Sequence, residues 1–270
     1  QDDWQVNDHL ILNLGIRWDY EDVPAYTDHV TSADYLAALY GPDPANPGQP
    51  WVNRWTNGGI DAINPNDYIS TGRNRENFKD AWAPRLGFSY DLNADEQHVI
   101  HGGAGRSYDR NLFKDLALEK TKSAVSLVRL EFEDPATGQC VREGATSTLC
   151  IPWDPNYLNG IDQLGAALAG RGGAEVFMLN NKLKTPYADQ ISLGMTNQTG
   201  EWLTDVTVQR IMSRDGFGFT LANRHPDGSF FLNGGQPWGE TVPGYGGTIV
   251  GDNGVESNNT QLLLSLEKPY

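Results

Sequence analysis

The sequence predicts an all-β protein, an antiparallel segment of a transmembrane β-barrel with long extracellular loops. Three observations predict this fold class. Apolar and polar residues alternate along several stretches of about ten residues, which is the length of a barrel strand. Aromatic residues stand at the ends of these stretches, as expected at a membrane interface. The connections between the stretches alternate between short and long.

The clearest strand covers residues 10–20, where every even position is apolar or aromatic. Because successive side chains of a strand point to opposite faces, one face is apolar and ends in Trp18 and Tyr20. A sandwich strand could show the same alternation. The strand's length and its one-sided aromatic residues favour a membrane strand. Its opposite face carries polar side chains that we expect to point into the barrel lumen: Asn13, Arg17 and Asp19.

The same alternation returns at residues 82–92 and 261–267, and more weakly at 187–196 and 203–212. His98–Tyr108 is a glycine-rich strand whose faces the sequence does not assign. Arg85 and Asp91 join the expected lumen-facing residues. Lumen charges can simply make the wall polar, or they can form a network that docks a plug. We expect six residues to face lipid: Leu12, Leu14, Leu86, Phe88, Leu264 and Leu266.

The connections support the same architecture. Short links are expected at residues 7–9, 93–97 and 199–201, and long segments at 22–80, 110–186 and 214–258. Compact soluble domains rarely contain such long irregular connections, whereas outer-membrane barrels have short periplasmic turns and long extracellular loops. The long segments are rich in Gly and Pro, and two short helices are predicted within them, at residues 33–39 and 161–169.

Composition narrows the classes of partner. Acidic residues (35) outnumber basic residues (20) among 270 residues, giving a net charge of −15. Nucleic acid is therefore not an expected partner, because phosphate neutralisation needs a basic patch. No apolar run approaches the roughly 18 residues of a membrane helix. The two cysteines, Cys140 and Cys150, are expected to form a disulfide, although two free thiols would also fit the sequence.

The whole chain is interpreted as one partial barrel domain, residues 1–270. Counting gives about seven strands, whereas bacterial barrels have an even number from 8 upward. The chain begins at Gln1 without a basic, apolar leader. We therefore expect an arc of a larger wall within a longer polypeptide.

The strand sequences resemble a known family. Gln1–Val6 followed by Leu10–Tyr20 resembles a characteristic hairpin of TonB-dependent outer-membrane receptors, most closely the Oar-like subgroup with a carboxypeptidase-regulatory-like domain. Pro84–Leu92 with Gly102–Asp109 resembles the next hairpin, and Tyr187–Gly194 the strand beyond it. The resemblance covers the strands and leaves the long loops unmatched.

The resemblance implies a 22-stranded barrel in the bacterial outer membrane that binds an extracellular ligand and imports it with energy from TonB. The implied partners are outer-membrane lipid, the receptor's own plug and the TonB complex, the last two through parts outside this sequence. It implies neither a cofactor nor an enzymatic activity. The ligand itself is not specified.

The chain offers few chemical sites. His98 and His101 would face opposite sides of a strand, so shared metal ligation is not expected. Tryptophans in the long segments are candidates for stacking on a ligand, with packing inside their own loops as the alternative: Trp51, Trp55, Trp153 and Trp238. The competing interpretation of the whole chain is a secreted β-sandwich or propeller that binds or hydrolyses carbohydrate, with its aromatic residues stacked on sugar rings.

Overall fold

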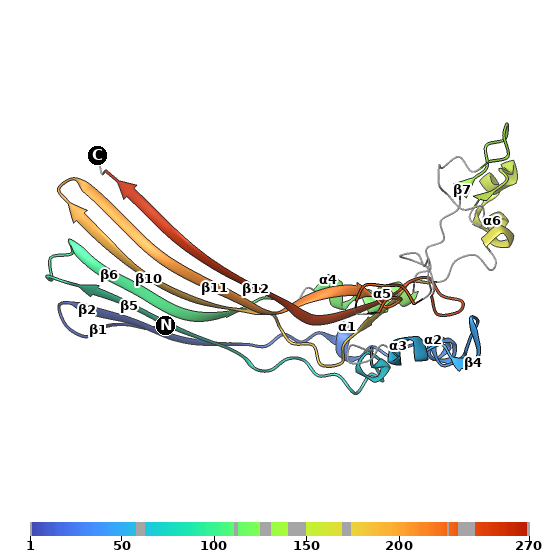
Figure 1. Ribbon diagram of the computed structural model, residues 1–270, viewed down its shortest axis with the longest axis horizontal. Helices are drawn as coiled ribbons and strands as arrows, with labels where there is room; N and C mark the ends of the chain where they lie inside the picture. Colours follow the sequence, from blue (N-terminus) through green and yellow to red (C-terminus); the bar gives the residue numbers. More distant parts are fainter. Residues whose placement is uncertain are drawn as a thin grey trace.

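A single large β-sheet dominates the structure, a computed structural model that describes residues 2–57, 63–110, 113–124, 131–139, 150–168, 174–225, 227–231 and 241–268. The sheet has eight strands in the order β1-β2-β5-β6-β10-β11-β12-β9. The short turns lie at one end of the sheet and the helices at the other (Figure 1). The strands are β1 (Asp2–Gln5), β2 (Leu10–Asp19), β5 (Ala81–Asp91), β6 (His98–Tyr108), β9 (Val176–Leu179), β10 (Tyr187–Thr199), β11 (Trp202–Leu221) and β12 (Thr248–Glu267).

The predicted strands and short links are confirmed. Within this sheet, neighbouring strands from β1 to β12 pair antiparallel. β9 lies parallel to β12 at the sheet edge and was not predicted, because its four residues are a brief apolar run inside a long segment. The sheet is open, as expected for an arc of a barrel wall.

The register shows which side chains share a face, because directly opposed residues point the same way. Leu12 opposes Phe88 and Leu14 opposes Leu86. Further along the sheet, Leu264 opposes Val206. The row of opposed residues that contains Val206 continues across β10 and β6 to β5, so Leu264 lies on the same face as Leu12 and Leu14. All six predicted lipid-facing residues therefore lie on one face. That face is largely uncovered by the chain: Leu14 is 43% and Leu264 70% exposed.

The apolar residues form a band that crosses the strands obliquely. On β12 the apolar run ends at Leu262, which shares a row with Leu12 of β2 through the intervening strands. On β2 the run continues from position 12 to Trp18, six residues further. Six residues cover about 20 Å, while the five strand spacings between β2 and β12 cover about 24 Å. The band thus makes an angle of about 40° with the rows of directly opposed residues, which run perpendicular to the strands. This angle matches the strand tilt of roughly 35–45° in membrane barrels.

The sheet continues beyond this band into the connecting segments. β11 and β12 have 20 residues each, so the predicted long segment 214–258 is too long at both ends. Two features hide the continuation: the pairing shifts between Ser213 and Gly216, and Asp215 has a φ of 54°. The apolar alternation is interrupted at the same place. Deleting 214–258 would therefore remove part of the wall as well as a loop.

The helices α1 to α5 lie near this extension of the sheet, whereas α6 lies apart from it (Figure 1). The helix predicted at 33–39 is confirmed, and the one predicted at 161–169 ends at Leu168. None of the described helices has the length and hydropathy needed to cross a membrane. The helical and short extended elements are α1 (Pro24–Thr27), α2 (Ala33–Leu39), β3 (Pro42–Asp43), β4 (Asn46–Pro50), α3 (Asn53–Thr56), η2 (Pro65–Asp67), α4 (Phe113–Leu116), α5 (Leu118–Ala124), β7 (Glu131–Phe132), β8 (Cys150–Ile151), η3 (Pro155–Asn159) and α6 (Ile161–Leu168).

The extension has a hydrophobic core on each face. Met178 and Val250 are paired neighbours of β9 and β12, and both belong to the larger core. Leu179, the next residue of β9, belongs to a second core with Val23, Tyr26 and Leu116. We call this double-sided assembly the loop body. The larger core consists of Tyr35, Leu39, Trp51, Val52, Trp55, Met178, Ala222, Val242 and Val250.

Candidate functional site

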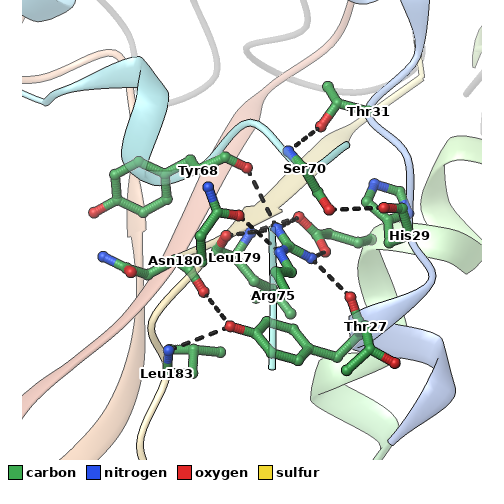
Figure 2. Close-up of polar contacts among 12 residues, drawn as sticks. Thr27, His29, Thr31, Tyr68, Ser70, Arg75, Leu179, Asn180 and Leu183 are labelled. Carbon is green, nitrogen blue, oxygen red and sulfur yellow. Dashed lines mark hydrogen bonds and ion pairs between the residues drawn. The ribbon is translucent and has the colours of Figure 1, made fainter. Parts of the chain in front are cut away.

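The loop body is held together by a buried ion pair. Arg75 and Glu119 have fully buried side chains and come from the first and second long segments. Arg75 Nη1 lies 2.5 Å and Nη2 2.9 Å from the two carboxylate oxygens of Glu119. Arg75 Nε also donates to Asn181 Oδ1 at 2.8 Å. Figure 2 shows Arg75 at the centre of this network, near Tyr68 and Leu179.

The ion pair also provides hydrogen-bond partners for the backbone of the edge strand β9. β9 is the last strand in the order, so backbone groups on its outer side have no strand partner. The Leu179 N–H donates to Glu119 Oε1 at 2.6 Å, and the Leu179 carbonyl accepts from Arg75 Nη2 at 2.7 Å. The two side chains thus take the place of a neighbouring strand. Sequence reasoning missed this pair, since its members are 44 residues apart in segments without periodicity.

A second polar contact stabilises the first long segment. Asp43 accepts from Arg54 Nε at 2.8 Å and from Arg54 Nη2 at 2.6 Å, and both side chains are largely buried. The hydrogen bonds from Arg54 hold the pKa of the Asp43 carboxyl well below its usual value, despite the opposing effect of burial. Close to the Arg75–Glu119 pair, burial lowers the pKa of His29, which favours the neutral imidazole.

A pocket with largely apolar walls opens between the first two long segments. Its volume is about 270 Å³. Apolar groups of both segments and of β11 form part of its wall, including Val23, Phe78, Leu183 and Phe217. Carboxylates of Glu76, Asp109 and Asp115 and the cations of Arg110 and Lys184 also line it. A pocket of mixed character such as this can bury an apolar group while orienting a polar one.

The hydrogen-bonded pairing of two neighbouring strands stops before their ends, near this pocket. Pairing between β5 and β6 ends at Arg85 and Gly105. The Asp91 N–H donates to the His9 carbonyl, on the β2 side of β5. Because the backbone groups of successive strand residues point to opposite sides, the even-numbered residues of β5 direct theirs towards β6. Pro84 has no N–H for the next bond to β6. A smaller pocket of about 190 Å³ is lined by the ends of β5 and β6 that are unpaired with each other, at Ala81 and Tyr108, and by Arg17 and Asp19.

The candidate tryptophans do not form one site. Trp51 and Trp55 are each 1% exposed, and Trp55 Nε1 donates to the Ala222 carbonyl at 2.7 Å. The interpretation of these two as ligand-stacking residues is wrong, because they fill the larger core. Trp153 is exposed and packs against Phe132, with ring centroids 4.8 Å apart. Trp238 lies outside the described residues.

The predicted lumen-facing residues share the face opposite the apolar band. Their register places Asn13, Arg17, Asp19 and Arg85 together on this polar face. Asn13 donates to Asp3 at 2.6 Å, and Arg17 to Asp19 at 2.8 Å. Asp91 has the same parity but lies at the strand end, where it accepts from the backbone of Asn93 and Glu96. Its carboxylate therefore stabilises the short turn.

The other candidate sites are separated in space or incompletely described. His98 contacts Asn197 and His101 contacts Asp205, so the two rings lie in different contacts on opposite faces of β6. Among the described residues, no group of three or more potential metal ligands is brought together. Cys150 is buried, but Cys140 lies outside the described residues, so their pairing stays a prediction.

Comparison with known proteins agrees with this architecture. The model of the family "Outer membrane beta barrel domain" matches residues 1–207. No curated protein matches the chain significantly. The solved structures that are similar to it include the three described next, and the chain spans between 18% and 28% of their lengths.

The first of these is the outer membrane transporter YddB from Escherichia coli, with 12% identity over 71% of this chain and 18% of that one (TM-score 0.41). The second is the siderophore receptor PirA from Pseudomonas aeruginosa, with 13% identity over 96% and 28% (TM-score 0.38). The third is a double mutant of the Serratia marcescens hemophore receptor HasR in complex with its hemophore HasA and heme, with 10% identity over 95% and 27% (TM-score 0.34).

The structure and the family match together decide between the two interpretations of the sequence. A β-sandwich would cover its apolar sheet face with a second sheet, whereas here large apolar side chains of the band are exposed on β2, β5, β10, β11 and β12. The matched model covers more than half of the 270 residues. The chain therefore belongs to the outer membrane β-barrel domain family and is located in the bacterial outer membrane.

Proposed function

We propose that this chain is part of a TonB-dependent outer-membrane receptor of the Oar-like subgroup, which binds a ligand at its extracellular loops and imports it. The motifs at Gln1–Tyr20, Pro84–Asp109 and Tyr187–Gly194 support the subgroup. The plug and the TonB contact belong to other parts of the receptor, and no catalytic step is proposed for this chain.

One observation carries the proposal: parts of all three long connections pack into one body at one end of the wall. Two hydrophobic cores and the buried Arg75–Glu119 pair hold it together. Connections that only joined strands would not need such a body. A preorganised surface binds a ligand at a lower entropic cost than mobile loops do.

The 270 Å³ pocket is the proposed ligand-contact site. It lies where both long segments meet β11, next to the core that contains Tyr26 and Leu116. The polar face of the sheet, with Arg17, Asp19 and Arg85, is proposed to face the lumen and contact the plug. Trp153 is a further candidate for ligand contact because its ring is exposed.

Uptake can be tested without knowing the ligand. Cells that produce the full-length receptor are grown in complex medium with TonB present or deleted, and the depletion of small molecules from the medium is compared. We expect at least one compound to be depleted only when both proteins are present. Depletion that does not depend on TonB would contradict the proposal.

A pair of variants then locates the binding site. Leu183→Trp places a larger side chain in the lining of the pocket, and we expect it to abolish the receptor-dependent depletion. Leu158→Trp is the matched control, since Leu158 is 77% exposed and is not part of the pocket lining. Equal depletion by the two variants would remove this pocket from the recognition surface.

A further inference from the structure

Three arginines lie on the apolar face of the sheet, directly beyond the outer edge of the band. On β11 the apolar residues Val206 and Val208 are followed on the same face by Arg210, which opposes Ile191. Arg106 of β6 opposes Asp189, and Arg214 opposes Tyr187. Because the short turns lie at the other end of the strands (Figure 1), these arginines are on the side of the loop body.

Two of the three arginines are already engaged by the protein. Arg106 donates two hydrogen bonds to Asp189, at 2.7 and 2.8 Å, and its guanidinium lies 4.1 Å from the centroid of the Tyr187 ring. Arg214 donates to Asn258 Oδ1 at 3.0 Å and lies 3.7 Å from Glu256. The charge of Arg106 is therefore matched within the sheet, whereas Arg214 has only a long contact to a carboxylate that is 61% exposed.

Arg210 is different. Its residue is exposed, and no hydrogen bond or ion pair joins it to any other described residue. Its opposed neighbours are Ile191, which is 52% exposed, and Thr260. An unmatched cation thus stands beside exposed apolar side chains, in a chain whose net charge is −15.

The chemistry of this position identifies its partner. An arginine at the edge of the hydrocarbon layer can bury its stem along apolar surface while its guanidinium reaches the headgroups. The planar guanidinium matches phosphate oxygens in a bidentate geometry. Basic side chains at a membrane interface recognise anionic headgroups in this way. Arg214 adds positive charge on the same face of the same strand, four residues further.

We propose that Arg210, with Arg214 beside it, binds a phosphate of an anionic glycolipid in the outer leaflet. The acyl chains of this lipid lie on the apolar surface formed by Ile191, Val208 and Leu262, which share this face of the sheet. The inference rests on membership of the outer-membrane family and is independent of the proposed transport function.

The test measures lipid binding by the full-length protein in a nonionic detergent, using native mass spectrometry. The probes are lipid A with two phosphates and a phosphate-free form with the same acyl chains. We expect wild type to bind the phosphorylated lipid at least about tenfold more tightly, as one charge-assisted contact can provide. Equal binding of the two lipids would overturn the proposal.

Variants assign the effect to Arg210. Arg210→Gln is expected to lose about tenfold in affinity for the phosphorylated lipid and Arg210→Lys less, with little change for the phosphate-free lipid. Arg17→Gln is the matched control, because Arg17 is an exposed arginine on the opposite face. Wild-type affinity in Arg210→Gln, or an equal loss in Arg17→Gln, would contradict the assignment.

Two further outcomes are decisive. If inorganic phosphate alone displaces the phosphorylated lipid from wild type, the site takes a soluble anion and the proposal is wrong. If Arg210→Gln does not assemble, as judged by loss of heat-modifiable gel mobility, the two-lipid comparison is made with Arg214→Gln. We expect that variant to keep a weaker preference for phosphate than wild type, and an unchanged preference would count against the paired site.

Discussion

The wall and the loop body bury their side chains in opposite ways. In the wall, residues such as Ile16 (69% exposed) and Leu264 (70% exposed) leave their apolar surface uncovered by protein. In the loop body, Trp51, Leu39 and Leu179 are almost completely buried. The stability of the wall therefore depends on the surrounding lipid, whereas the loop body has an internal core of the kind found in soluble domains.

The two regions also place their charges differently. The ion pair of Arg17 and Asp19 in the wall is exposed, and exposed pairs contribute roughly 0–1 kcal/mol. The pair of Arg75 and Glu119 in the loop body is fully buried. Removing one partner of a buried pair leaves an uncompensated charge, which makes this pair the most sensitive point of the molecule.

The largest effect is expected at Arg75. Arg75→Ala should destabilise the loop body by about 3–5 kcal/mol, because Glu119 would remain buried without its partner. Limited proteolysis of the protein in detergent should then cut the long segments rapidly, while heat-modifiable mobility of the barrel is kept. Arg73→Ala is the control, since Arg73 is exposed. Equal protease resistance of the two variants would refute the central role of this pair.

A smaller effect is expected in the wall. Leu14 is the middle residue of the apolar run from Leu10 to Trp18 on β2. Leu14→Arg should cost roughly 2–4 kcal/mol in lipid vesicles, because a charge near the membrane centre loses its hydration. Asn13→Arg, on the polar face, should cost much less. Similar unfolding free energies for the two variants would show that the faces are assigned incorrectly.

The predicted disulfide should act on the loops alone. A bridge from Cys140 to Cys150 would stabilise them by about 2–3 kcal/mol. Thiol labelling of the denatured, unreduced protein should find no reactive cysteine, and labelling after reduction should find both. Two reactive thiols before reduction would rule the bridge out.

Acid should weaken the loop body before the wall. The pKa of Asp43 is lowered in the folded protein by hydrogen bonds from Arg54, so the carboxylate stabilises the fold above its unfolded pKa of about 4. That contribution should be lost progressively as the pH falls below 4. Asp43→Asn should be less stable than wild type at pH 7 and show a flatter pH dependence, measured by proteolysis with an acid-tolerant protease. An identical pH dependence would contradict the assignment.

The same contrast explains how much the sequence could predict. The wall was predicted because lipid on one side and water on the other impose a period of two, visible at Leu12, Leu14 and Ile16. The loop body was not, because its contacts join distant segments without a period. Arg75 and Glu119 carry no local sign of their pairing, and the burial of Trp51 and Trp55 depends on β9 and β12 packing against them.

The orientation of the two regions is the central claim, and labelling of intact cells tests it most directly. Leu158→Cys in the second long segment and Asp95→Cys in a short turn are compared in a variant without native cysteines, using a membrane-impermeant maleimide. Both positions are exposed in the structure, so only the membrane should distinguish them. We predict rapid labelling at position 158, and labelling at position 95 only after the outer membrane is permeabilised. Equal labelling of the two positions in intact cells would contradict a wall that crosses the membrane with its loop body outside.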